Sequence, residues 1–131
     1  MIKISFRNVL MFGAAAVVLQ APSRSVWDGV YTDAQATRGT DMFMNRCAPC
    51  HDPSEFSGKA FLDQWKDQTA YNLYDTIRTE MPKDNPGSLS ADNYRDIVTF
   101  MFKANSFPSG TTDLEANDDV LKQIKIEPKP R

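Results

Sequence analysis

The chain has 131 residues, with 15 Lys and Arg, 17 Asp and Glu, one His and two Cys. A chain of this length has room for one domain with a small core. The slight acidic excess argues against nucleic acid or an anionic membrane surface as a partner, because both bind basic proteins.

Residues 1–25 have the organisation of a secretory signal peptide. Lys3 and Arg7 give a positive start, an apolar run covers 9–19, and small residues stand near Ser25. The run is shorter than the roughly 20 apolar residues that span a bilayer. We therefore expect a periplasmic protein, cleavage near Ser25 and no membrane span afterwards. The alternative is an uncleaved signal that keeps the protein membrane-associated.

Helical periodicity predicts an all-α domain over residues 26–108. Thr32 is the predicted N-cap of a helix over 33–46, and Gln35 would complete a capping box with it. Gly39 costs this helix about 1 kcal/mol relative to Ala. It therefore marks a close crossing of another helix, or it is incidental.

The segment 52–67 contains Pro, Gly and mixed polarity, which predicts a loop with one short turn over 60–64. A second helix is predicted over 70–80, with Thr69 as its N-cap. Pro82 ends it, so the residue before Pro82 lies where the chain leaves the helix.

Ser90 is the predicted N-cap of the clearest helix, over 91–104, which has a continuous apolar stripe. Residues 109–131 are mostly polar. We expect them to form an irregular surface tail, with a helical turn near 117–122 and extended chain over 123–127.

Both cysteines and the only histidine lie in the string Cys47-Ala48-Pro49-Cys50-His51. At this spacing two thiols can attach a haem covalently while the adjacent imidazole binds its iron. Three alternatives compete: a disulfide-exchange site, a zinc site with a carboxylate as fourth ligand, and a structural disulfide. The pair ends a predicted helix instead of starting one, and a histidine follows it directly. Both features favour haem.

Four methionines are candidates for the second axial ligand of the iron: Met42, Met44, Met81 and Met101. The first two share a helix with the attachment site, and Met101 belongs to the apolar stripe of the last helix. Met81 is freed from its helix by Pro82 and is the predicted ligand. A His/Met pair raises the reduction potential and fills both axial positions, which suits an electron carrier better than an enzyme.

These residues together resemble the class I monohaem c-type cytochromes. The resemblance covers residues 26–108 and implies a cytochrome c fold, with three to four helices wrapped around one covalently bound haem c. In that family the first and last helices cross near a Gly and an aromatic residue. The resemblance thus implies a crossing that involves Gly39, Phe43 and either Phe100 or Tyr94.

The strings VWDGVYTDAQATRG, MPKDNPGSLS and FPSG are similar to small bacterial cytochromes associated with quinoprotein dehydrogenases. This similarity implies a periplasmic, PQQ-dependent dehydrogenase as electron donor and a respiratory-chain acceptor. The protein would be a soluble shuttle or a permanent subunit of a dehydrogenase or membrane complex. The less favoured alternatives are a thiol oxidoreductase and a haem enzyme in which Met81 is displaced.

Trp65 and three lysines complete the candidate site. In some relatives a Trp donates a hydrogen bond to a haem propionate, so Trp65 either does this or only packs on the haem. Lys59, Lys66 and Lys83 fall in segments expected around the haem edge. They steer an acidic partner, or they are ordinary solvated lysines.

Overall fold

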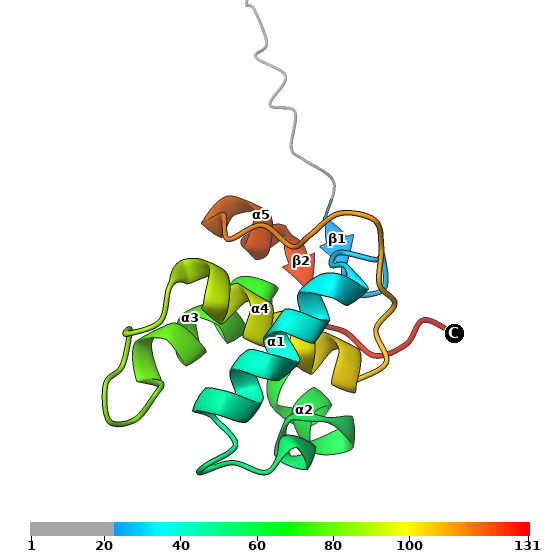
Figure 1. Ribbon diagram of the computed structural model, residues 1–131. Coiled ribbons are helices and arrows are strands. Elements are labelled where there is room, and N and C mark those ends of the chain that lie inside the picture. Colours follow the sequence, from blue (N-terminus) through cyan, green and yellow to red (C-terminus); the bar gives the residue numbers. More distant parts are fainter. Residues whose placement is uncertain (1–22) are drawn as a thin grey trace, which may run out of the picture.

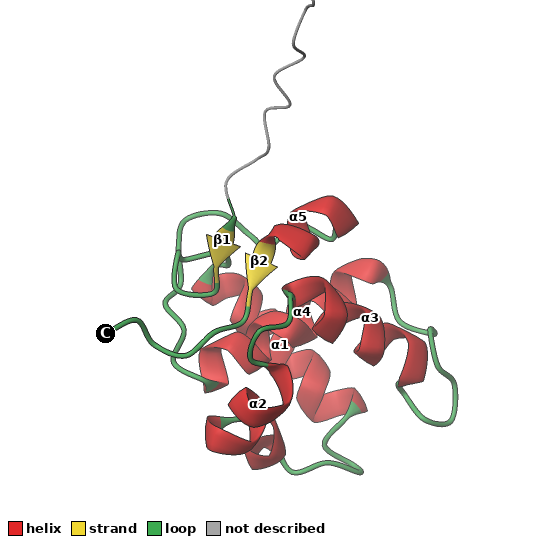
Figure 2. Ribbon diagram, turned by 180° about the vertical axis from the view of Figure 1, so that it is seen from behind, coloured by secondary structure: helices red, strands yellow, loops and turns green. Residues whose placement is uncertain are grey.

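The computed structural model describes residues 23–131, in which helices enclose the core and two short strands close one end (Figures 1 and 2). The elements in chain order are β1 (Arg24–Ser25), α1 (Asp33–Arg46), the 3₁₀ helix η1 (Pro53–Phe56), α2 (Gly58–Trp65), α3 (Ala70–Glu80), α4 (Ala91–Ala104), α5 (Asp118–Gln123) and β2 (Ile124–Lys125). The all-α prediction is confirmed. Most of the predicted signal peptide, residues 1–22, lies outside the described residues. In 23–131 no helix has the length and apolar character needed to cross a membrane.

The three long helices α1, α3 and α4 begin and end at the residues predicted from the sequence. At each N-terminus the hydroxyl of Thr32, Thr69 or Ser90 accepts the backbone N–H three residues later, at 3.1–3.3 Å. Such caps satisfy N–H groups that have no partner inside the helix. Local capping chemistry therefore sets these boundaries.

Helices α1 and α4 cross at Gly39, as the family resemblance implied (Figure 1). A Cβ atom at Gly39 would lie 1.9 Å from the carbonyl oxygen of Asp96 in α4. One turn further along, Phe43 stacks on Phe100 with ring centroids 4.5 Å apart. The aromatic residue at the crossing is therefore Phe100, and the glycine is required by the close approach of the two backbones.

The segment 52–67 is more regular than the predicted loop: the expected short turn over 60–64 is part of the longer helix α2, and η1 precedes it. Ser57, the residue before α2, makes no side-chain cap. Instead the backbone N–H of Gly58 donates to the side chain of Asn105 at 2.9 Å, and the Asn105 amide donates to the carbonyl of Phe56 at 2.9 Å. A residue far away in sequence thus positions α2.

The prediction that 109–131 is an irregular tail on the surface is wrong, although its expected helical turn and extended stretch are present as α5 and β2. Four of its apolar side chains are at most 2% exposed, namely Leu114, Leu121, Ile124 and Ile126. Strand β2 pairs in parallel with β1, with Arg24 opposite Ile124, and α5 packs on α3 (Figure 2). The tail is part of the fold because its apolar residues cover the core at the end where β1 lies.

Gln35 fixes the start of this C-terminal segment instead of completing the predicted capping box. Its buried side-chain amide donates to the carbonyl of Leu114 at 3.0 Å and accepts the N–H of Leu114 at 2.7 Å. Both backbone groups of Leu114 are thereby satisfied in a buried place, where an unpaired group would be costly.

Candidate functional site

The segment with both cysteines forms one tight turn directly after α1. The backbone N–H of Cys47 donates to the carbonyl of Phe43 at 2.8 Å, which closes the helix. The carbonyl of Cys47 then accepts the N–H groups of Cys50 and His51 at 3.0 and 2.9 Å. This turn holds the two thiols and the imidazole together at the end of a rigid helix.

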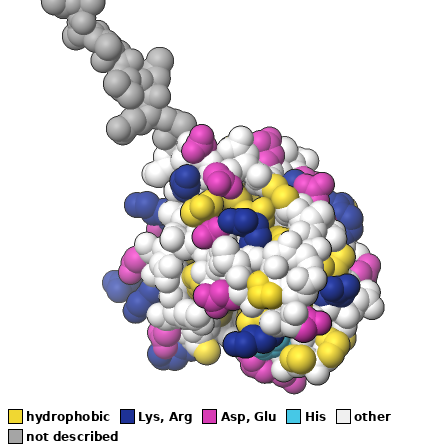
Figure 3. All heavy atoms as spheres, turned by 90° about the vertical axis from the view of Figure 1, so that its left-hand side faces the viewer, with side chains coloured by type: hydrophobic (Ala, Val, Ile, Leu, Met, Phe, Trp, Pro, Cys, Tyr) yellow, Lys and Arg dark blue, Asp and Glu magenta, His cyan; other side chains and the backbone are white. Residues whose placement is uncertain are grey.

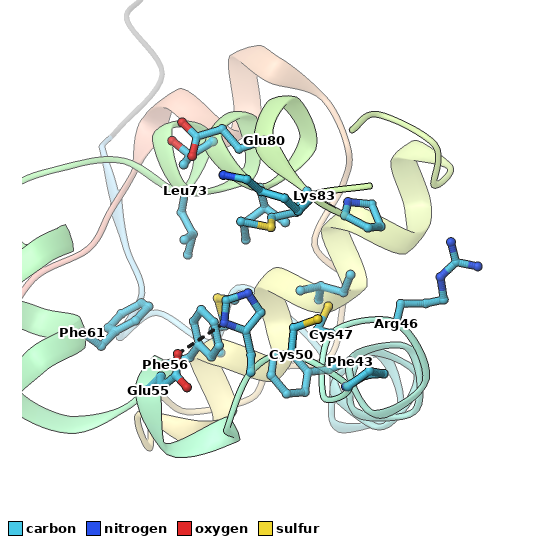
Figure 4. Close-up of a pocket in the computed structure, with 18 of the residues that line it drawn as sticks. Phe43, Arg46, Cys47, Cys50, Glu55, Phe56, Phe61, Leu73, Glu80 and Lys83 are labelled. Atoms are coloured by element: carbon cyan, nitrogen blue, oxygen red, sulfur yellow. Dashed lines mark hydrogen bonds and ion pairs between the residues drawn. The ribbon is translucent and has the colours of Figure 1, made fainter. Parts of the chain in front are cut away.

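The turn forms part of the wall of a cavity of about 990 Å³, which lies at the upper end of the range for cofactor pockets (Figure 4). Figure 4 shows Leu73 across the cavity from the two cysteines, with Phe61 at its left-hand edge. Apolar side chains from α1, α2, α3, α4 and the segment after α3 dominate the lining, which includes Phe43, Pro49, Phe56, Phe61, Trp65, Leu73, Ile77, Met81, Pro82, Ile97 and Met101.

The structure brings the predicted haem-binding residues to this one cavity: Cys47, Cys50, His51, Met81 and Trp65 all line it. The donor set of two thiols, one imidazole and one thioether is the set that a His/Met-ligated haem c requires. Trp65 is 8% exposed, and in the described residues its indole N–H makes no hydrogen bond to the protein.

The other three methionines that were candidates for the axial ligand differ in their position relative to the cavity. Met44 is 54% exposed, Met42 is partly buried, and neither lines the cavity. Met101 does line it, from within α4 and with 3% exposure. The structure therefore excludes two of the four candidates by position and leaves Met81 and Met101. Only Met81 lies outside a helix, at the C-cap of α3.

Glu55 is a site residue that the sequence analysis missed. One oxygen of its carboxylate lies 3.3 Å from Nδ1 of His51, and the other accepts the backbone N–H of Asp52 at 2.9 Å (Figure 4). The Asp52 bond, followed by the His51 contact, holds the pKa of Glu55 below its usual value. The contact at Nδ1 leaves Nε2 as the ring nitrogen available to a metal. The sequence signal that could have pointed to Glu55 is its place three residues after Asp52, the spacing of a capping box.

The thiols do not have the character of a disulfide-exchange site. Cys47 is half-buried and Cys50 exposed, and neither is in a disulfide. Burial raises the pKa of Cys47 above its usual value, and the neighbouring Arg46 only partly opposes this. Redox-active thiols have lowered pKa values and lie at helix N-termini, whereas Cys47 is the C-cap of α1.

The lysines proposed to steer a partner differ in their surroundings. Lys59 is ion-paired with Asp63, Lys66 is exposed, and Lys83 lines the cavity. Figure 3 shows the face on which the single histidine reaches the surface, and there basic and acidic side chains are interspersed. Lys83 is the only one of the three lysines at the cavity.

Comparison with known proteins agrees with this geometry. Residues 34–101 match the family described as cytochrome c oxidase, cbb3-type, subunit III. The cytochrome bc1 complex cytochrome c subunit of Corynebacterium diphtheriae is 33% identical over 92 residues, which are 63% of this chain and 31% of that protein. The protein of the same description from Corynebacterium efficiens is 32% identical over 95 residues, 65% of this chain and 31% of the relative.

The chain thus spans about a third of the length of the curated relatives that it matches. No solved structure matches it. The family match covers α1, the cysteine turn, the cavity wall and most of α4, which are the parts that form the site. The chain belongs to this family of c-type cytochrome domains, whose cofactor is haem c and whose function is electron transfer.

Proposed function

We propose that the chain carries single electrons on one haem c that is attached to Cys47 and Cys50 and ligated by His51 and Met81. The observation that carries this proposal is the convergence of these four side chains on one apolar cavity of about 990 Å³. Haem c supplies the one-electron redox centre when it is bound.

Each residue has a separate task in this arrangement. Cys47 and Cys50 would hold the haem through two thioether bonds, each formed by addition of one S–H across one vinyl C=C, which needs no oxidant. The turn after α1 keeps His51 beside them, and the Glu55 contact orients its ring. The apolar wall would keep water from the bound haem, and Met81 would supply the thioether ligand of its iron.

The acceptor or donor that we propose is a complex of the respiratory chain. Both curated relatives are described as the cytochrome c subunit of a cytochrome bc1 complex, and the family takes its description from an oxidase subunit. These descriptions favour a second candidate beside the free shuttle, namely a permanently bound subunit. A quinoprotein dehydrogenase as donor rests on the sequence resemblance alone.

Co-purification separates the shuttle from the subunit. The chain is tagged at its C-terminus, expressed in its own host and isolated from gently solubilised membranes and from the soluble fraction. A shuttle is recovered alone from the soluble fraction. A subunit is recovered in stoichiometric amount with respiratory-complex proteins, and that result would reject the shuttle.

We also propose export to the periplasm, and the fold refines the cleavage position. Loss of residues 1–25 would delete β1, which pairs with β2 beside the buried Ile124. We therefore expect the exported chain to begin at or before Arg24. Its intact mass measures this directly, and a mature chain that begins at Val26 would show that β1 is not needed.

The spectrum and intact mass of the exported protein test the haem proposal. We expect the mass of the chain plus one haem, a sharp reduced α-band, and the weak ferric band that marks a sulfur–iron bond. A haem-free protein with two titratable thiols would overturn the proposal and leave thiol chemistry as the better explanation.

The two methionines of the cavity are separated by matched substitutions. Leu is close in volume to Met, so M81L and M101L each remove a sulfur with little change in packing. We expect M81L to lose the sulfur–iron band and bind external imidazole readily, while M101L keeps the band. The opposite result would make Met101 the axial ligand.

A further inference from the structure

We propose that Tyr94 is a positioning residue that holds the segment carrying Met81 against the cavity. This inference rests on the proposed role of Met81 as axial ligand. Tyr94 does not line the cavity, so it would act through the backbone of Met81 and not by touching haem.

The hydroxyl of Tyr94 joins the two ends of the segment 81–89, which connects α3 to the start of α4. It donates a hydrogen bond of 2.7 Å to the carbonyl of Met81 and accepts the backbone N–H of Leu89 at 3.3 Å. One hydroxyl thus fixes the distance between the two ends of the segment, from which the Met81 side chain projects into the cavity.

The surroundings of this hydroxyl make the arrangement rigid. Tyr94 is 0% exposed and belongs to the first turn of α4, a helix whose N-cap Ser90 is itself hydrogen-bonded. The carbonyl of Met81 accepts a second bond from the N–H of Gly87 at 3.3 Å. Six of the seven residues between Met81 and Leu89 are exposed, so few side-chain contacts could replace the hydroxyl.

A soft, neutral thioether is easily displaced from iron when its chain can move away. When the Met81 carbonyl is held, the segment 81–89 gains less entropy if the Met81 sulfur leaves the iron. Binding of the Met81 sulfur is therefore favoured over binding of an external ligand. The expected consequence of losing the hydroxyl is therefore a weaker hold on the sixth coordination position, with the haem attachment unchanged.

The test is Y94F in the haem-loaded protein, with imidazole as the competing ligand. We expect Y94F to bind imidazole about five- to tenfold more tightly than the unchanged protein, the effect of one lost hydrogen bond. The sulfur–iron band should disappear at a correspondingly lower imidazole concentration. An imidazole affinity within about twofold of the unchanged protein would overturn the inference.

Tyr31 provides a matched control. It is also buried, and its hydroxyl donates to a backbone carbonyl, that of Phe107, at 2.6 Å. Y31F loses a comparable bond away from the cavity, so it should leave imidazole affinity unchanged even where it lowers stability. Equal effects of Y31F and Y94F would show that general destabilisation, and not positioning, loosens Met81.

Two further measurements separate this inference from the proposed function and from a folding defect. If M81L keeps the sulfur–iron band, Met81 is not the ligand and the proposed function fails first. If Y94F does not accumulate with haem, the inference is tested instead by amide hydrogen exchange in the unchanged protein, at the N–H of Leu89 that the Tyr94 hydroxyl accepts. The amide of Leu89 should exchange slowly, and exchange as fast as in an unstructured peptide would overturn the inference.

Discussion

The carboxylate of Glu55 lies 3.3 Å from Nδ1 of His51, on the imidazole nitrogen that the proposed haem iron does not use. A carboxylate partner makes an iron-ligating histidine more electron-rich, which stabilises the ferric form. The same carboxylate is held by the N–H of Asp52, so its position does not depend on the histidine alone.

We therefore expect E55Q to raise the reduction potential, by an amount on the order of tens of millivolts. Glu80 also lines the cavity and provides the control, because E80Q removes the same charge without touching His51. Potentiometric titration of the three proteins measures the shift. Equal shifts in E55Q and E80Q would mean that only the charge, and not the hydrogen bond, acts on the iron.

Substitution of Gly39 should be far more damaging than its small size suggests. In G39A the added Cβ would meet the Asp96 carbonyl, which belongs to the backbone of α4 and cannot turn away. We expect the free energy of unfolding to fall by about 3 kcal/mol or more. Denaturant unfolding followed by helical circular dichroism measures this loss. T37A, on the exposed face of the same helix, should stay within about 0.5 kcal/mol.

Loss of the Gln35 amide should release the C-terminal segment. Q35A leaves both backbone groups of Leu114 unpaired in a buried place, which should cost about 2–4 kcal/mol. Gln68 offers the comparison, because its amide donates to a solvent-facing carbonyl, that of Gln64. Thermal unfolding of Q35A and Q68A measures the difference. Similar midpoints for the two variants would show that Gln35 does not hold the segment.

Asp113 should make a small contribution to stability that depends on pH. Its hydrogen bonds with the hydroxyl of Thr32 and with Arg38, at 2.7 Å from the latter, hold its pKa below the usual value. A lowered native pKa stabilises the fold above the unfolded value of about 3.9, and the effect is lost as pH falls through the native value.

At neutral pH we expect D113N to lose about 0.5 kcal/mol, a modest figure because the Asp113 side chain is 43% exposed. The difference between D113N and the unchanged protein should shrink as pH falls below about 4. Urea unfolding at several pH values measures it. D41N, on the exposed surface of α1, is the control, and a difference for D113N that persisted at pH 2 would contradict the assignment.

The boundaries that could be predicted from the sequence are those that local chemistry decides. Three helices are capped by hydroxyl groups that accept the backbone N–H three residues later, those of Thr32, Thr69 and Ser90. Pro82 stops α3 from continuing. The cysteine motif is equally local. Helix α2 was predicted only as a short turn, because its N-terminus depends on Asn105, a contact over 47 residues that no short pattern contains.

The C-terminal segment was misjudged for a related reason. Leu114, Leu121, Ile124 and Ile126 show no helical period together. Their burial depends on β1, near the other end of the chain, and on α3, in its middle. For the site, the sequence supplied the residues to consider but not their relation to a cavity. Glu55 and Tyr94 therefore emerged only when the structure placed them beside His51 and Met81.

The strand pair β1–β2 and the cysteine turn lie at opposite ends of α1 (Figure 1). A 14-residue helix is about 21 Å long, so the place where the two terminal segments meet is well separated from the cavity. Further domains joined through these segments would leave the haem side open to a redox partner. The same unit could therefore work as a separate carrier or as one module of a longer protein.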